Sequence, residues 1–214
     1  MNIRWVVAGL ALALLSAPGA FAELKPLNPK ADRNERWNWF VEAAYALHQK
    51  QIEGREIDTV RATGGYHRLP EFYDEEKYYD RKTGRLLSEI QRERAHPERI
   101  HSIHVFVYDG KDRPARRYSA WFLPNYREAP RATWVTLYVY HQDLVAYRQF
   151  DASDVLVSEN CEGRYAGRPV YISLWEEEIS SAERDPKGVM TTPDYRVCFA
   201  GLARTSAGKY TTPQ

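Results

Sequence analysis

The clearest helical pattern in the chain covers residues 34–53. Large apolar side chains recur there at steps of three and four residues and form a single stripe, which consists of Trp37, Phe40, Val41, Ala44 and Leu47. Asp32 or Asn34 can cap the start of this helix, and Gly54 fits its end. Because the stripe contains so many large residues, we expect the helix to pack on a broad surface such as a sheet.

After this helix, short segments of alternating polarity are separated by turn residues, which predicts a series of strands. The expected strands are residues 56–62, 75–79, 86–91, 103–108, 116–122, 133–140, 144–150, 155–158 and 168–174. The sharpest hairpin signal is Asp109-Gly110 between two of these segments. Since each connection is too short for a parallel crossover, we expect a mostly antiparallel sheet of about six or more strands.

The first 22 residues have the three-part layout of a secretory signal. Arg4 supplies a positive region, an apolar run over residues 5–15 follows, and small residues stand at Ala20 and Ala22. The run is shorter than the roughly 20 residues of a membrane-spanning helix, and Pro18 follows it. We therefore expect cleavage after Ala22, no integral membrane span in the mature chain, and a periplasmic or secreted protein.

The C-terminal part changes from a strand pattern to a helical one. Residues 175–184 predict a short acidic helix, and Thr192-Pro193 marks the start of a last helix over residues 193–202. This last helix contains Cys198, and the other cysteine of the chain is Cys161. An isolated pair in an exported chain predicts a disulfide, because redox and metal sites show Cys-x-x-Cys spacing or nearby histidines. The bridge would tether the helical C-terminal segment to the sheet.

Length and charge restrict the organisation and the partners of the mature chain. Removing residues 1–22 leaves 192 residues (214 minus 22), which we divide into an extended leader over 23–33, a single α+β domain over 34–204 and a flexible tail over 205–214. Removing Arg4 reduces the 30 Lys+Arg to 29, against 29 Asp+Glu, so the mature net charge is zero. Since nucleic acid selects strongly basic surfaces, we do not expect it as a partner.

The sequence contains no nucleophile elbow, phosphate-binding glycine loop, His-Glu-x-x-His or EF-hand loop, so we predict no catalytic residue, metal or cofactor. His101 and His104 are three residues apart in a strand, where such side chains face opposite ways and do not form a metal pair. His141 and Asp143 stand at a turn and could orient an acid–base pair, but no nucleophile is marked beside them.

The mature chain is rich in aromatic side chains, with 15 Tyr and 6 Trp in the full sequence. In the strand over 133–140, alternation places Val135, Leu137 and Val139 on a core face and the aromatic residues on the other. Aromatic side chains with polar tips, together with an arginine from the next strand, predict a ligand-binding face that consists of Trp134, Tyr138, Tyr140 and Arg148. The alternative is a second core layer under the C-terminal segment.

Three functions remain open. The first is an exported, non-catalytic protein that binds an envelope component or a partner protein through the aromatic sheet face. The second is a hydrolase of envelope polymers with an unconventional site at His141, Asp143 or His104. The third is a structural subunit of an envelope assembly.

Overall fold

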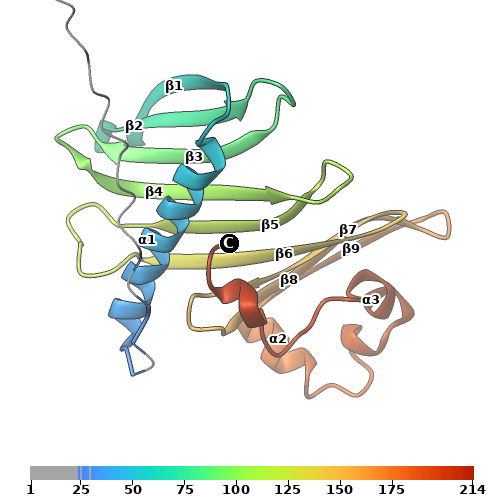
Figure 1. The fold of residues 1–214 in the computed structure, drawn as a ribbon. Helices are drawn as coiled ribbons and strands as arrows, with labels where there is room; N and C mark the ends of the chain where they lie inside the picture. The colour runs from blue at the N-terminus through green and yellow to red at the C-terminus, as the bar shows by residue number, and fades with distance from the viewer. Residues whose placement is uncertain (1–23, 25, 29) are drawn as a thin grey trace, which may run out of the picture.

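A computed structural model describes residue 24, residues 26–28 and residues 30–214; the predicted signal sequence, residues 1–22, lies outside the described residues. The described chain forms helix α1, then nine strands, then a C-terminal segment of short helices (Figure 1). The strands make one sheet in which each strand pairs antiparallel with the next along the chain. Their bounds are β1 Ile57–Tyr66, β2 Leu69–Asp80, β3 Leu86–Glu93, β4 His96–Tyr108, β5 Pro114–Trp121, β6 Ala132–His141, β7 Asp143–Phe150, β8 Leu156–Tyr165 and β9 Arg168–Trp175.

The antiparallel sheet is confirmed, and several strands are longer than the sequence predicted. We expected the first strand to end before Gly64 and Gly65, but β1 continues to Tyr66. A Cβ on Gly64 would lie 2.6 Å from the ring of Tyr73, and one on Gly65 would overlap the carbonyl oxygen of Leu69. The two glycines therefore allow β1 and β2 to approach closely, and they do not interrupt the strand.

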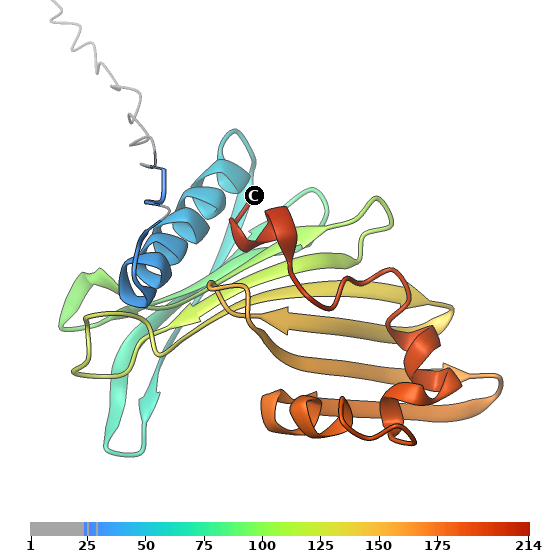
Figure 2. The ribbon, with the colours of Figure 1, turned by 90° about the horizontal axis from the view of Figure 1, so that it is seen from below.

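Helix α1 (Arg33–Ile52) lies across the middle of the sheet (Figures 1 and 2). Asp32 caps it by accepting a hydrogen bond of 2.9 Å from the backbone N–H of Glu35. Gly54, with φ of +68°, follows its end. The apolar stripe of α1 packs against side chains from the central strands, and the shared core contains Trp37, Phe40, Val41, Ala44, Ile90, Ile103, Val105, Tyr118, Ala120, Val135, Leu137 and Phe150. We call the sheet face that carries these side chains the covered face, and the opposite one the open face.

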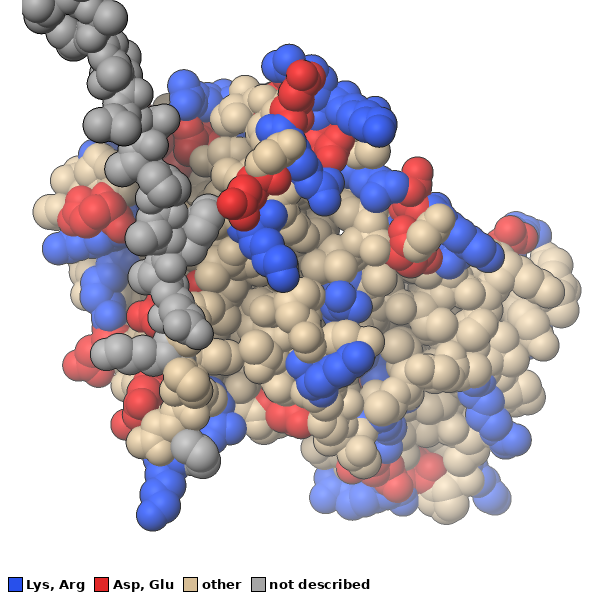
Figure 3. Space-filling view, viewed as in Figure 1, with Lys and Arg blue, Asp and Glu red and all other residues tan. Residues whose placement is uncertain are grey.

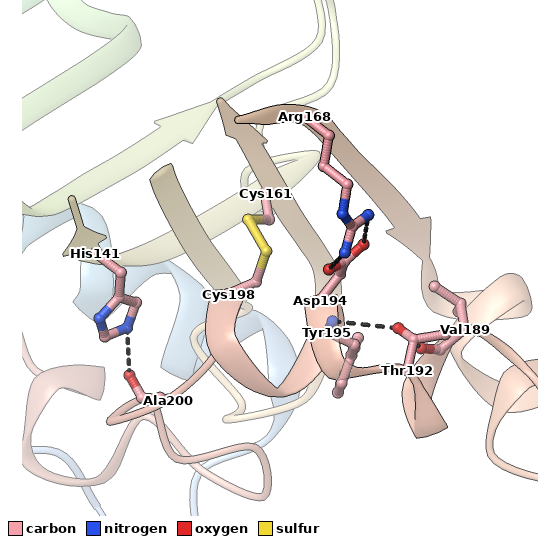
Figure 4. Close-up of a disulfide and its surroundings, with 9 residues drawn as sticks. All are labelled: His141, Cys161, Arg168, Val189, Thr192, Asp194, Tyr195, Cys198 and Ala200. Atoms are coloured by element: carbon pink, nitrogen blue, oxygen red, sulfur yellow. Dashed lines mark hydrogen bonds and ion pairs between the residues drawn. A yellow bond between two sulfur atoms is a disulfide. The ribbon is translucent and has the colours of Figure 1, made fainter. Parts of the chain in front are cut away.

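The C-terminal segment packs on the same covered face, over the last strands. It contains α2 (Glu176–Ala182), η1 (Val189–Thr191), α3 (Pro193–Cys198) and η2 (Gly208–Thr211). The predicted disulfide between Cys161 of β8 and Cys198 of α3 is present, with 5.9 Å between the two Cα atoms (Figure 4). Around it lies a second apolar cluster of Leu144, Ala146, Val170, Ile172, Tyr195 and Phe199. The predicted α+β fold therefore holds broadly, although the sheet dominates it.

Residues 205–214, for which we expected a flexible tail, pack against the rest of the domain. Asp154, at the turn between β7 and β8, accepts hydrogen bonds from the hydroxyl of Ser206 and from the backbone N–H of Ala207. Arg116 donates to the carbonyl oxygen of Gln214 over 3.2 Å. The end of the chain consequently lies beside α1 (Figures 1 and 2).

Charges of both signs are interspersed on the side of the molecule that carries α1 (Figure 3). Among the described residues, no helix combines the length and the apolar character needed to cross a bilayer.

Candidate functional site

The register of the sheet decides which side chains lie on the open face. Residues directly opposite each other in an antiparallel pair share a face, and neighbours along a strand alternate. One row of direct partners runs from β3 to β6 as Glu89, His104, Ser119 and Trp134. These residues alternate with core residues such as Val105 on the same strands, so they lie on the open face. Since α1 and α3 both pack on covered-face residues, they leave this face bare.

A continuous band of polar side chains crosses the open face from β2 to β8. We define this polar band as Glu75, Lys77, Glu89, Gln91, Ser102, His104, Arg117, Ser119, Thr136, Gln149, Ser158 and Asn160. Hydrogen bonds link its members: Gln91 donates to Glu75 over 2.8 Å, and Ser102 donates to Gln91 over 2.8 Å. Further along, Gln149 donates to Thr136 over 3.1 Å and accepts from Ser158 over 2.7 Å. These bonds fix the polar side chains in position.

Large aromatic side chains stand on both sides of the polar band. The register places the flanking aromatics Trp121, Trp134 and Trp175 on one side and Phe106, Tyr138, Tyr140, Tyr147 and Tyr171 on the other. Two pairs are in edge or tilted contact, with ring centroids 4.3 Å apart for Trp121–Trp134 and 5.4 Å for Tyr138–Tyr147. At the end of the face, Tyr171 is 77 % exposed and Trp175 49 %. The small members of the band, such as Ser119 and Thr136, are buried between these larger neighbours.

Of the predicted site residues, the structure brings together Trp134, Tyr138 and Tyr140 and places Arg148 elsewhere. Arg148 lies opposite Leu137, whereas Tyr138 lies opposite Tyr147, so Arg148 points to the covered face. The grouping of Arg148 with the aromatics is therefore wrong. Alternation along β7 places Arg148 on the covered face, where an apolar residue is usual. The arginine beside these aromatics on the open face is Arg117 of β5, which no local sequence pattern indicated. Only the pairing of β5 with β6, which places it opposite Thr136, identifies it.

Arg148 belongs to a buried ion cluster under the C-terminal segment. Its Nε donates to Oε1 of Glu159 over 2.7 Å, and Glu159 has no exposed surface. The hydroxyl of Tyr195 donates to the same carboxylate, over 2.8 Å and 2.7 Å to its two oxygens, and Arg204 lies 3.4 Å away. Burial and the Glu159 carboxylate raise the pKa of Tyr195 to about 12, which keeps its hydroxyl protonated as a donor. This cluster links β7 and β8 to the C-terminal segment and lies on the covered face.

The histidines do not form a metal site. His101 is 2 % exposed, and its Nε2 lies 2.5 Å from the hydroxyl of Tyr66. His104 bonds through Nδ1 to the hydroxyl of Ser119 over 2.9 Å, and burial, with Arg117 adding to it, lowers the pKa of His104 to about 4. His141 lies 2.9 Å from the carbonyl oxygen of Ala200 (Figure 4). In the part of the chain that the structure describes, no group of three or more His, Cys, Asp or Glu could hold a metal ion.

Two carboxylates share one lysine at the β2 end of the polar band. The Nζ of Lys77 lies 3.1 Å from Glu75 and 3.4 Å from Glu89. Burial and the neighbouring Glu75 raise the pKa of Glu89. Burial also opposes the ionisation of Glu75, but hydrogen bonds from Gln91 and Lys77 outweigh it and lower its pKa. Glu75 therefore ionises readily, and Glu89 beside it retains its proton more strongly.

Two hollows in the described part of the surface are not lined by the flanking aromatics. A hollow of about 580 Å³ borders Glu75 and Arg92, and another of about 440 Å³ lies between α1 and Phe122. Neither contains any of the flanking aromatics. An exposed face of this kind suits an extended ligand better than a small molecule.

Comparison of the chain with protein-family models, with curated proteins and with solved structures found no match.

Proposed function

We propose that this chain is an exported, non-catalytic protein that binds a glycan polymer of the cell envelope through the open face of its sheet. The observation that carries the proposal is the polar band with aromatic side chains on both sides, on the face opposite the one that α1 and α3 cover. Export is supported by the secretory layout of residues 1–22 and agrees with the disulfide between Cys161 and Cys198.

The chemistry of the open face matches that of a sugar chain. A sugar ring has apolar C–H faces, which stack on indole and phenol rings, and hydroxyl groups, which bond to amides, carboxylates and guanidinium groups. The flanking aromatics offer the first kind of contact. The half-buried members of the polar band offer the second beside them, and these include Glu75, Lys77, Glu89, Gln91, Arg117 and Asn160. Because the band is already held by its own hydrogen bonds, little side-chain order has to be gained on binding.

The charges of the polar band favour a polar ligand that is not strongly charged. Glu75 and Glu89 are offset by Lys77 and Arg117, so the face lacks the excess of basic residues that nucleic acid requires. The polar centre also makes the face unsuited to a lipid chain, because its donors and acceptors would then lose water without gaining partners.

Co-sedimentation with purified peptidoglycan sacculi, with soluble envelope polysaccharides as competitors, tests this proposal. We expect the mature chain to bind, and we expect Trp134→Ala/Tyr147→Ala to weaken binding at least tenfold, which corresponds to about 1.4 kcal/mol. The matched control is Tyr126→Ala, since Tyr126 is an exposed aromatic of the loop between β5 and β6. Equal binding by the double variant, or no binding of any envelope glycan, would contradict the proposal.

A second candidate is hydrolysis of the bound polymer, and the carboxylates on either side of Lys77 favour it. A pair whose pKa values are shifted in opposite directions provides an acid and a base. Ser119, the serine of the open face beside His104, is wholly buried, which argues against a serine nucleophile. If the chain is a hydrolase, Glu89→Gln should abolish the release of soluble fragments from sacculi and leave co-sedimentation unchanged.

A further inference from the structure

The two edges of the sheet differ in how well they are protected against pairing with another strand. The edge strand β1 contains a register shift between Gly64 and Tyr66. It also carries two charged residues in ion pairs, Asp58 with Arg81 and Arg61 with Glu76. Bulges and charges of this kind discourage edge-to-edge pairing. The other edge strand, β9, pairs with β8 without any register shift, and its one charged residue, Arg168, stands at its start.

The backbone groups that β9 presents at the edge follow from Pro169 and Trp175. Proline has no N–H, so Pro169 fits a position whose backbone groups point away from β8. Along a strand, the backbone N–H and C=O groups of successive residues point alternately to one side and the other. Tyr171, Ser173 and Trp175 then also point outward. Trp175 agrees with this, because its N–H donates to the carboxylate of Glu178 over 2.8 Å and not to β8. Tyr171 and Ser173 are therefore the residues of β9 that present both an N–H and a C=O at the edge.

We propose that two copies of this chain pair through β9 in antiparallel orientation about a two-fold axis, with Tyr171 of each copy opposite Ser173 of the other. In a hydrogen-bonded antiparallel pair, the two opposite residues exchange both of their N–H···O=C bonds. This register therefore satisfies the outward groups of Tyr171 and Ser173 in both copies. It also puts Pro169, which has no N–H, opposite Trp175, whose N–H is already bonded to Glu178.

The side chains fit the same register. Val170 comes opposite Leu174, and Ile172 opposite its own copy, so apolar residues meet on the covered face. At the ends, Arg168 of one copy, which also pairs with Asp194 of its own chain, comes opposite Glu176 of the other, so no like charges meet there. Tyr171, 77 % exposed in the single chain, becomes covered on the open face. The two open faces would then form one continuous surface, so a polymer that spans both would bind more tightly than to one.

Cysteine cross-linking tests the register directly. Residues opposite each other in a hydrogen-bonded pair have Cα atoms about 5.5 Å apart, within the range that a disulfide spans, whereas the diagonal neighbours lie roughly 7–8 Å apart. A mixture of Tyr171→Cys and Ser173→Cys chains should therefore form a cross-linked dimer under mild oxidation, and each variant alone should form much less. Equal cross-linking in the mixture and in the separate variants, or none in any sample, would overturn the proposed pairing.

The mass of the protein in solution, measured by light scattering across a concentration series, tests whether the dimer depends on the edge. We expect the wild type and Ser173→Ala to approach twice the chain mass, and Ser173→Pro to stay monomeric, because proline removes the outward N–H without touching the ladder to β8. If circular dichroism shows that Ser173→Pro does not fold, Tyr171→Lys/Ser173→Lys replaces it and puts like charges opposite each other. A monomeric wild type, or a dimer that survives the edge variants, would overturn the proposal. Glycan binding by a monomer would leave the proposed function intact.

Discussion

Glu159 is a carboxylate with no exposed surface, held by Arg148 and Tyr195 and close to Arg204. Removing Arg148 takes away the nearest cation and leaves the buried carboxylate with Tyr195 and the more distant Arg204, and breaking a buried ion pair costs about 3–5 kcal/mol. We expect Arg148→Ala to lower the free energy of unfolding by that amount in urea denaturation. Arg61→Ala is the matched control, because Arg61 pairs with Glu76 at the surface and its loss should cost less than about 1 kcal/mol. Similar losses in both variants would show that the cluster does not stabilise the docked segment.

His48 makes the stability depend on pH. Its Nδ1 lies 2.7 Å from the hydroxyl of Ser88, and burial, together with the charge of Arg92, lowers its pKa from 6.5 to about 4. The unfolded chain thus takes up a proton near pH 6.5 that the folded chain takes up only near pH 4. The contribution of His48 to the free energy of unfolding is fully present above pH 6.5. It is lost as the pH decreases toward 4, by up to about 1.4 kcal/mol per pH unit. Urea denaturation at several pH values should show a smaller decrease for His48→Gln than for the wild type, and an identical decrease would contradict the assignment.

At the scale of elements, the β1–β2 hairpin depends on two glycines. Because a Cβ on Gly65 would overlap the carbonyl of Leu69, Gly65→Ala should force the strands apart and cost more than about 1 kcal/mol. Gly110, in the β4–β5 turn, is the control, since nothing lies within 4 Å of its added Cβ and its φ is not positive. The midpoint of thermal unfolding should be lower for Gly65→Ala than for the wild type, and it should not be lowered by Gly110→Ala. Equal midpoints would contradict the close approach of the two strands.

The disulfide fixes the C-terminal segment to the sheet. It joins Cys161 to Cys198 across a sequence separation of 37 residues. In the chain-entropy model, a loop of this length contributes roughly 4 kcal/mol. We expect Cys161→Ser/Cys198→Ser to lose stability of that order in urea denaturation and to retain the sheet signal in circular dichroism. A loss of the whole fold would show instead that the sheet does not form without the docked segment.

The elements that the sequence predicts correctly are those with local signals. The stripe of α1, its cap at Asp32, which was one of two candidates with Asn34, and the Asp109-Gly110 turn each depend on residues close together in the chain. Alternation also placed Val135 and Leu137 in the core correctly. The polar band was missed, because a lone Ser119 or Thr136 in a strand suggests solvent exposure. Only the register across several strands shows that such residues adjoin one another and lie buried.

At the scale of the whole molecule, the two faces of the sheet differ in what lies on them. Helix α1 and the C-terminal segment cover one face and provide the hydrophobic core that stabilises the fold. The other face is left with the polar band and its flanking aromatics, which contribute little to that core and which we propose as the ligand-binding face. A binding role for this face, as proposed, would account for the aromatic residues that lie on it in a chain without a catalytic motif.

The most direct test of this account is hydroxyl-radical footprinting of the mature protein, alone and with its own envelope fraction. We expect Trp121, Trp134 and Tyr147 to become less reactive in the presence of the envelope fraction, and Tyr126 and Tyr210, which lie off the open face, to stay unchanged. Protection of Tyr126 or Tyr210 without protection of the open face, or no protection anywhere, would contradict it.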